Sequence, residues 1–248
     1  SWSVFGQVVI LLLIQIGGLG VVTIMSGLMI LLHKKMGIND RLLLQDAFNL
    51  NSLSGLVRFV KKVVIGTLVI EGIGALLYMT VFIPDFGSKG IWISIFTSIS
   101  AFCNAGIDII AENSLCDYAL NPMVNTVTCL LIVIGGIGYI VWWDIIRVIK
   151  NIRQNKRKIF GNLTLHSKIA IISTLLLIIV GAILVFVLEY DNPQTLKDYT
   201  LLQKIEVSFF QSVTTRTAGF ATLPQENLTN ATAVVCLFLM FIGGSPVG

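Results

Sequence analysis

Two short segments of the sequence carry residue types that could coordinate a cation through backbone oxygens. They are "SAFCNAGID" (Ser100–Asp108) and "QSVTTRTAGF" (Gln211–Phe220), and each contains hydroxyls and an Ala-Gly pair followed by a bulky residue. Glycine readily adopts positive φ, so consecutive carbonyls can face one axis. Rings of such carbonyls can replace the hydration shell of a cation. One such segment makes a poor site, whereas several around an axis make a selectivity filter.

The rest of the chain must hold these segments inside a membrane. Of the 248 residues, 55% are apolar and 12% are charged, with a mean hydropathy of +0.89. Soluble domains have about 25% charged residues. The fold class expected is therefore an all-α integral membrane protein. Its long apolar segments are Val8–Leu32, Val63–Ile83, Met123–Trp143, Ile169–Leu188 and Ala231–Ile242.

Two further apolar stretches, Ile91–Cys103 and Ile205–Thr215, are too short to cross a bilayer, which takes about 20 residues. Each lies just before or within one of the Ala-Gly segments. They are expected to be re-entrant helices that enter the membrane and turn back. Interfacial helices are the alternative.

The distribution of positive charge predicts the orientation. Residues 33–62 and 147–168 together hold 13 of the 17 Lys and Arg, while the other loops carry acidic side chains. By the positive-inside rule the two basic stretches are cytoplasmic, and both short apolar stretches lie on the outer side. The net charge of +4 is therefore a topology signal, and nucleic-acid binding is not expected.

An internal repeat organises the chain. The Ala-Gly segments align at Gly106 and Gly219, and the apolar helices carry "IGGLG", "IGGIG" and "IGGSP", beginning at Ile16, Ile134 and Ile242. The repeating unit is an outward helix, a short helix, Ala-Gly, and an inward helix with Ile-Gly-Gly. Close helix packing is an alternative explanation for the Ile-Gly-Gly elements alone.

These motifs, with "LIVIGGIGY" (Leu131–Tyr139) and "FIGGSPVG" (Phe241–Gly248), resemble the Trk/Ktr/HKT superfamily of potassium transporters, most closely the bacterial Ktr- and Trk-type membrane subunits. The resemblance implies four M1–P–M2 repeats around one pore. Residues 1–35 are then M2 of the first repeat, 36–59 a cytoplasmic linker, and 60–148 the second repeat. Residues 149–167 are a basic cytoplasmic loop and 168–248 the third repeat, cut short in M2. The first filter strand and the fourth repeat are expected to lie outside this chain.

The same resemblance assigns the site. It implies that Asn104, Ala105, Gly106 and Ile107 form the second filter strand, and that Thr217, Ala218, Gly219 and Phe220 form the third. Their carbonyls, with the Thr217 hydroxyl as a further candidate, would coordinate dehydrated K⁺. Na⁺ is a candidate coupling ion, and no covalent cofactor is expected. Ile107 stands where the family often has Phe, which is expected to change packing with little effect on selectivity.

Two charged side chains are expected at membrane depth. Inserting an arginine there costs about 2.5–3.5 kcal/mol, so Arg216 is expected behind the filter, donating hydrogen bonds to carbonyls or a carboxylate. A snorkelling surface arginine is the alternative. Glu71 in "LVIEGIGALL" is either a buried partner between helices or a protonated carboxyl among apolar neighbours, and a proton or cation relay is less favoured.

The helix that begins near Thr229 meets Gly243, Gly244, Ser245 and Pro246 while still inside the bilayer. Two glycines weaken a helix by about 1 kcal/mol each and a proline by about 3 kcal/mol. The resemblance implies that this break is a flexible loop that gates the pore below the filter. A proline kink that only shapes packing is the alternative. The matching glycines Gly17 and Gly135 lack the Ser-Pro, which argues for a special role of this segment in the third repeat.

The expected function is potassium uptake across a bacterial plasma membrane. No nucleophile–base set or metal-ligand spacing appears in the sequence, so an enzyme is not expected. A broken-helix secondary transporter for another solute and an intramembrane enzyme using Glu71 remain as alternatives. The resemblance implies a homodimer on a cytoplasmic ring of nucleotide-binding regulatory subunits. The stretch Arg147–Lys168 is a candidate contact for that ring or for anionic membrane lipids.

Overall fold

The structure is a computed structural model that describes residues 2–19, 53–110, 113–150 and 160–244. Within these ranges the chain is helical and contains no strand. The helices are α1 (Val4–Gly18), α4 (Leu53–Phe86), α5 (Lys89–Phe102), α6 (Pro122–Ile137), α7 (Tyr139–Lys150), α8 (Leu165–Glu189), α9 (Leu201–Thr214) and α10 (Asn230–Ile242). Three short 3₁₀ turns lie at Cys116–Tyr118, Phe160–Asn162 and Gln225–Asn227.

The two longest helices among the described residues meet the length and hydropathy of membrane spans. They cover Lys61–Phe86 in α4 and Leu165–Glu189 in α8, and α6 with α7 adds a third span if that bent pair counts as one. The outer residues of α8 are apolar and exposed, as a lipid-facing helix requires, with Ile183 57% exposed. Composition and helix length thus agree on a membrane protein.

Polar caps set where the helices begin. Asn121 accepts hydrogen bonds from the amides of Met123 and Val124, with Pro122 in the first helical position of α6. Thr164 caps α8 and Thr229 caps α10 through the amide three residues on. Asn and Thr at these positions satisfy amides that have no partner within the helix.

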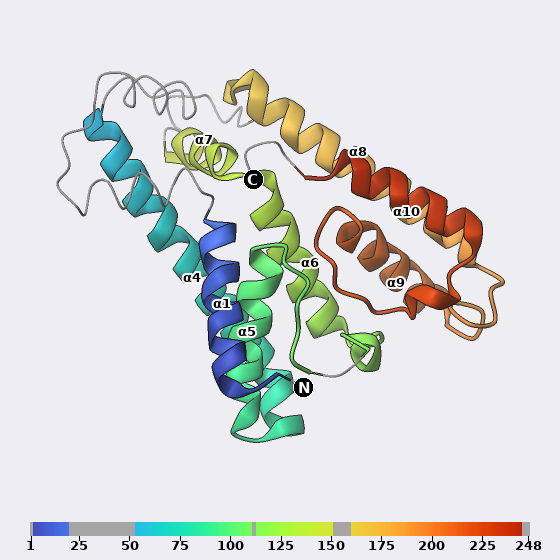
Figure 1. The fold of residues 1–248 in the computed structure, drawn as a ribbon. Coiled ribbons are helices and arrows are strands. Elements are labelled where there is room, and N and C mark those ends of the chain that lie inside the picture. The colour runs from blue at the N-terminus through green and yellow to red at the C-terminus, as the bar shows by residue number, and fades with distance from the viewer. Residues whose placement is uncertain (1, 20–52, 111–112, 151–159, 245–248) are drawn as a thin grey trace.

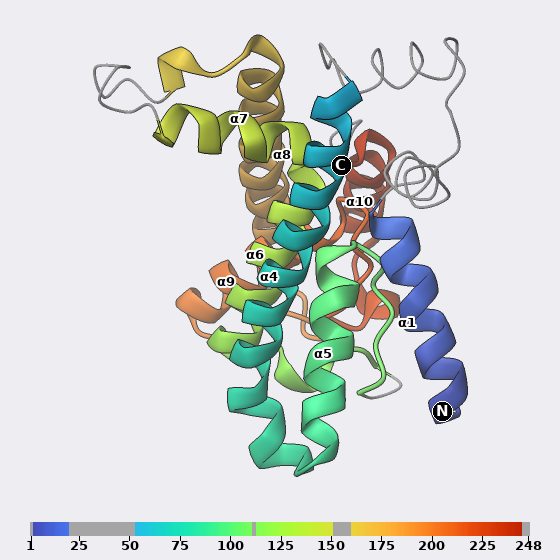
Figure 2. The same cartoon turned by 90° about the vertical axis from the view of Figure 1, so that its left-hand side faces the viewer.

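The short helices α5 and α9 are enclosed by the longer ones. Figures 1 and 2 show α5 beside α4 and α1, and α10 beside α8. Nine of the 14 residues of α5 are buried, including Ser94, Thr97, Ser98 and Ser100. An interfacial helix would turn its hydroxyls to water and not bury them in the protein. This enclosure favours the re-entrant interpretation over the interfacial one.

The apolar stretch Met123–Trp143, expected as one membrane helix, is broken. Helix α6 ends at Ile137, Gly138 adopts φ +95°, and α7 leaves at an angle of 95°. Figure 2 shows α7 running across the direction of α4 and α8. The Trp142 Nε1 donates to the Ile134 carbonyl at 2.8 Å. This bond gives a hydrogen-bond partner to a backbone carbonyl in the last turn of α6, next to the break. The Tyr139 hydroxyl donates to the Gly18 carbonyl, also at 2.8 Å.

The break at the end of α10 has no counterpart at the matching glycine of α6. Helix α10 ends at Ile242 and Gly243 has φ +66°, whereas α6 continues through Gly135 and ends at Ile137, before Gly138. Both breaks use a glycine with positive φ, a conformation that costs glycine little. Ser245 and Pro246, the linker 36–52 and most of the basic loop (151–159) lie outside the described residues.

Candidate functional site

The two Ala-Gly segments, 113 residues apart at their glycines, lie against each other. A Cβ built on Gly106 would clash with the Ala218 carbonyl oxygen and lie 2.6 Å from Gly219 Cα. A Cβ built on Gly219 would lie 3.2 Å from Gly106 Cα. Gly106 therefore has no room for a side chain, and Gly219 has little.

The two segments share an alternating backbone conformation. Gly106 and Gly219 have φ +63° and +87°, and two residues earlier Asn104 and Thr217 have φ +53° and +76°. Positive φ is uncommon for residues other than glycine, and it is costly for a β-branched threonine. The same unusual pattern at matching positions points to one backbone design used twice.

Each segment is fixed to the helix before it by the amide of its alanine. Ala105 N donates to Ser100 O and Ala218 N to Thr214 O, each at 2.9 Å. Each of these short helices is in turn fixed to a long helix by a serine. Ser98 Oγ donates to Glu71 O at 2.7 Å, and Ser212 Oγ to Ile178 O at 2.8 Å.

Glycines allow this close approach between the long and short helices. A Cβ on Gly74 would lie 2.5 Å from Ser98 Oγ, while one on Gly181 would clash with Ser212 Oγ. Gly74 and Gly181 each lie three residues beyond the carbonyl that receives the serine hydrogen bond. The two halves of the described chain therefore attach their short helices in the same way.

The bulky residues that close the two segments differ in environment. Phe220 is 1% exposed, and its carbonyl accepts a 2.6 Å hydrogen bond from Thr214 Oγ1. Ile107 is 37% exposed. The Thr217 hydroxyl is exposed and donates to the Arg216 carbonyl at 2.5 Å, which leaves its oxygen lone pairs free to accept. The difference between Ile107 and Phe220 is thus one of packing.

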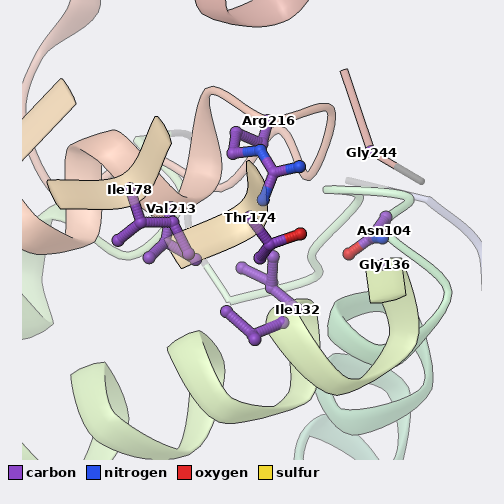
Figure 3. A pocket seen from close by; sticks show the side chains of 9 residues that line it. Asn104, Ile132, Gly136, Thr174, Ile178, Val213, Arg216 and Gly244 are labelled. Atoms are coloured by element: carbon purple, nitrogen blue, oxygen red, sulfur yellow. The ribbon is translucent and has the colours of Figure 1, made fainter. Parts of the chain in front are cut away.

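Arg216 joins the segment that carries Gly219 to the end of α10. Its Nη2 and Nε donate to the Gly243 carbonyl at 3.0 and 3.3 Å. A cavity of about 10 Å³ lies beside it, lined also by Asn104, Gly136 and Gly244. Figure 3 shows Arg216 and Asn104 on two sides of this cavity, with the Asn104 amide oxygen pointing inward. That oxygen is buried without a hydrogen-bond partner. The cavity has the size of one water molecule.

Glu71 is 4% exposed and contacts side chains from two other parts of the chain. Gln15 Nε2 donates to both carboxyl oxygens at 3.1 and 3.2 Å, and Cys103 Sγ lies 3.7 Å from Oε1. Cys103 directly precedes Asn104. Glu71 therefore ties the start of the segment that carries Gly106 to α1 and α4, and the described residues that surround it include no cation.

The loops that follow the two segments are bonded to each other. Leu115 N donates to the Ala221 carbonyl at 2.9 Å, and Ala221 N donates to Ser114 Oγ at 3.3 Å. Cys116 Sγ lies 3.7 Å from the same carbonyl. Burial, and then the charges of Asp117, Asp108 and Glu226, raise the pKa of the Cys116 thiol above its ordinary value. The thiol is therefore neutral at physiological pH.

Two carboxylates that the sequence analysis did not single out hold the starts of α8 and α10. Asp144 Oδ2 accepts from Thr164 N and Oγ1, both at 2.8 Å. Glu189 Oε1 accepts from Thr229 N and Oγ1 at 2.9 and 2.8 Å. Each threonine caps its helix, and a carboxylate at a helix N-terminus is favoured by the helix dipole. The Thr-x-x-Ser and Thr-x-x-Thr patterns were the available sequence signal.

Fold and site together define a multi-pass helical membrane protein that holds two matching non-helical segments between buried short helices. The family described as "TrkH: Cation transport protein" matches residues 1–248, and the chain belongs to that family. The predicted resemblance to Trk- and Ktr-type proteins and the predicted location in a bacterial membrane are confirmed.

Three curated relatives are similar over nearly the whole chain. Ktr system potassium uptake protein B of Bacillus subtilis is 40% identical over 98% of this chain and 53% of its own length. Potassium/sodium uptake protein NtpJ of Enterococcus hirae is 39% identical over 98% and 52%. Ktr system potassium uptake protein B of Vibrio alginolyticus is 32% identical over 98% and 52%. The chain spans about half the length of the curated relatives it matches.

Proposed function

We propose that the chain is part of a potassium uptake protein and contributes two strands to a selectivity filter built from backbone carbonyls. The strands are 104–107 and 217–220. The observation that carries the proposal is the close pairing of Gly106 and Gly219, each within a segment of alternating φ. Carbonyl rings of this kind suit a dehydrated monovalent cation. The names of the similar proteins supply K⁺ as the ion, and NtpJ adds Na⁺ as a second candidate.

The direction of the short helices supports a cation over an anion. Helix α5 ends at Phe102 and α9 ends at Thr214, so their C-terminal ends lead directly into the two segments. A helix C-terminus carries partial negative charge. A site for an anionic solute would use helix N-termini instead. The broken-helix transporter of an anion is therefore disfavoured.

The architecture we propose is that of repeated M1–P–M2 units. Residues 60–148 and 168–248 form two of them, with α4–α5–α6 and α8–α9–α10 as the matching helices. Residues 1–35 belong to the preceding unit. The matching serine and alanine hydrogen bonds in the two halves support this repeat. A closed pore needs two more strands than this chain supplies.

The gate we propose is the segment Gly243–Pro246, where α10 ends. The bond between Arg216 and the Gly243 carbonyl connects this segment to the third filter strand.

For partners, we propose a homodimer resting on a cytoplasmic nucleotide-binding regulatory ring, as the Ktr-type resemblance implies. The basic stretch 147–168 would contact that ring or anionic lipids. Neutralising Lys156, Arg157 and Lys158 together should weaken capture of the regulator in a pull-down. Unchanged capture would remove that contact.

The filter is tested by Gly219→Ser in the full protein reconstituted in proteoliposomes. The added side chain meets Gly106 and requires a strained positive φ, so discrimination between K⁺ and Na⁺ should narrow. Gly72→Ser is the matched control, because nothing lies within 4 Å of a Cβ at that glycine. A Gly219→Ser protein with the selectivity of the unmodified protein would refute the assignment.

A further inference from the structure

A second cavity, separate from the paired Ala-Gly segments, lies between α6, α8 and α9. Its volume is about 440 Å³, which falls within the range of about 300–1,000 Å³ usual for small-molecule sites. Along α6 it is lined by Asn125, Cys129 and Val133, which are four residues apart and so share one helix face. Leu175 and Ile179 line it from α8. Most of its wall is therefore apolar.

One end of this cavity is polar and negatively charged. Asn125 is 2% exposed, and its Nδ2 donates to Glu206 Oε1 at 3.1 Å and to Ala119 O at 2.8 Å. These two bonds fix the orientation of the amide and hold the Glu206 carboxylate at the cavity. Asn125 Oδ1 is buried without a partner.

Glu206 itself is short of positive charge. Among the residues that the structure describes, no cationic side chain forms an ion pair with it. The nearby Lys204 donates instead to the Tyr190 carbonyl at 2.8 Å and lies over the Tyr190 ring. A carboxylate at the edge of an apolar cavity, with an unpartnered amide oxygen beside it, has acceptors in excess of donors. A cationic donor is the chemical group that would complete it.

The polar and apolar ends of the cavity follow the same direction as the head and chains of a lipid in the outer leaflet. Asn125 lies in the first turn of α6, next to the outer loop, whereas Val133 lies two turns deeper along the same helix. The polar end is therefore at the outer surface and the apolar wall extends toward the membrane centre. An amphiphile with its head at Glu206 and its chain beside Val133 matches this polarity.

We propose that this cavity binds a phospholipid with a primary-amine headgroup, phosphatidylethanolamine. Its ammonium group donates to the Glu206 carboxylate, and one acyl chain packs along α6 and α8. A second copy of this chain is a poorer occupant, because a concave apolar cavity with one charged end fits a single chain and its head better than a flat protein surface. The inference is independent of the ion that the protein carries.

The test is native mass spectrometry of the protein purified from membranes, mixed with phosphatidylethanolamine, phosphatidylcholine or phosphatidylglycerol. Phosphatidylethanolamine should be retained most strongly, since phosphatidylcholine has the charge but no N–H donor. Glu206→Gln should weaken its retention about tenfold, the effect of losing one charge-assisted hydrogen bond. Glu226→Gln, a carboxylate of the outer loop, is the control and should leave retention unchanged.

The apolar part is tested by filling it. Leu130 lines the cavity and is 53% exposed, so Leu130→Trp should fold and displace the lipid. Leu184→Trp is the control, because Leu184 is 40% exposed and lies about half a turn around α8 from the cavity-lining Leu175. Equal retention of all three lipids, or full retention in both Glu206→Gln and Leu130→Trp, would overturn the proposal. So would a Leu130→Trp protein that keeps its lipid and loses its partner subunit, which would make the cavity a protein interface.

Discussion

The guanidinium of Arg216 and the backbone carbonyl of Gly243 are joined by two hydrogen bonds, with Nη2 at 3.0 Å and Nε at 3.3 Å from one oxygen. Arg216 lies directly before Thr217 in the segment that carries Gly219, and Gly243 begins the non-helical end of α10. Hydrogen bonds from a charged donor contribute about 1.5–3 kcal/mol, more than neutral ones. Because of this contact, a movement of the backbone at Arg216 would also move the end of α10 at Gly243.

Arg216→Gln should loosen that connection and raise K⁺ flux in the absence of the regulatory partner. Glutamine keeps one donor but loses the charge and the fork of two N–H groups. Rb⁺ tracer uptake into proteoliposomes, with and without regulator, measures the effect. Lys197→Gln is the control, since Lys197 is an exposed cation outside both basic stretches. Equal flux and equal regulation in the Arg216 variant would show that the contact has no role in gating.

Gly106 should tolerate alanine less well than Gly219. A Cβ at Gly106 would clash with Ala218 O and lie 2.6 Å from Gly219 Cα, and both of these are backbone atoms. At Gly219 the nearest atom would be 3.2 Å away. Both variants carry the cost of positive φ, but only Gly106→Ala must also displace backbone. K⁺ affinity and K⁺/Na⁺ selectivity should fall further in Gly106→Ala. The reverse order would contradict the packing of the two segments described here.

Much of this arrangement could be anticipated from the sequence, and the reasons differ from residue to residue. The short helices followed from length, because Ile91–Cys103 cannot cross a bilayer. The break at Gly138 did not follow, because the apolar run continues through Trp143 on both sides of that glycine. The break depends on Trp142 and Tyr139 finding carbonyls elsewhere, which are tertiary contacts. Likewise, the charge of Arg216 predicts that a hydrogen-bond acceptor lies beside it. Only the fold shows that this acceptor is the Gly243 carbonyl.

Glu189 should be important for stability and not for transport. It is fully buried and accepts four hydrogen bonds, from Asn192 Nδ2, Thr195 Oγ1, and the amide and hydroxyl of Thr229. Glu189→Ala leaves these donors unsatisfied and should lower the free energy of unfolding by about 3 kcal/mol or more. Thermal unfolding in detergent measures the loss. Glu226→Ala, in a 3₁₀ turn of the outer loop, is the control. A Glu189→Ala protein with unchanged thermal stability would contradict the role assigned to Glu189.

The end of α10 should govern how flux is controlled. Replacing Gly243, Gly244, Ser245 and Pro246 with alanine removes the positive φ at Gly243 and the proline that cannot continue a helix. Helix α10 should then extend, and flux should rise while its dependence on the regulator falls. Proteoliposome flux with and without regulator is the measurement. Transport that stays unchanged and fully regulated would exclude a gate at Gly243–Pro246. The segment would then be a kink that only shapes helix packing.

The thiol of Cys116 tests both the orientation and the electrostatics of the outer loops. The positive-inside rule places it on the outer face, and burial with neighbouring acidic groups raises its pKa. Thiolate is the reactive form, so a raised pKa means slower reaction at neutral pH and a labelling rate that rises only at higher pH than for an unperturbed cysteine.

The experiment uses a protein with Cys103, Cys129 and Cys236 replaced by alanine, in intact cells, with a maleimide that cannot cross membranes. We expect labelling from outside with this shifted pH profile. Labelling only after the cells are opened would reverse the topology, and a half-maximal rate at the pH of a free cysteine would contradict the burial and charge around Cys116.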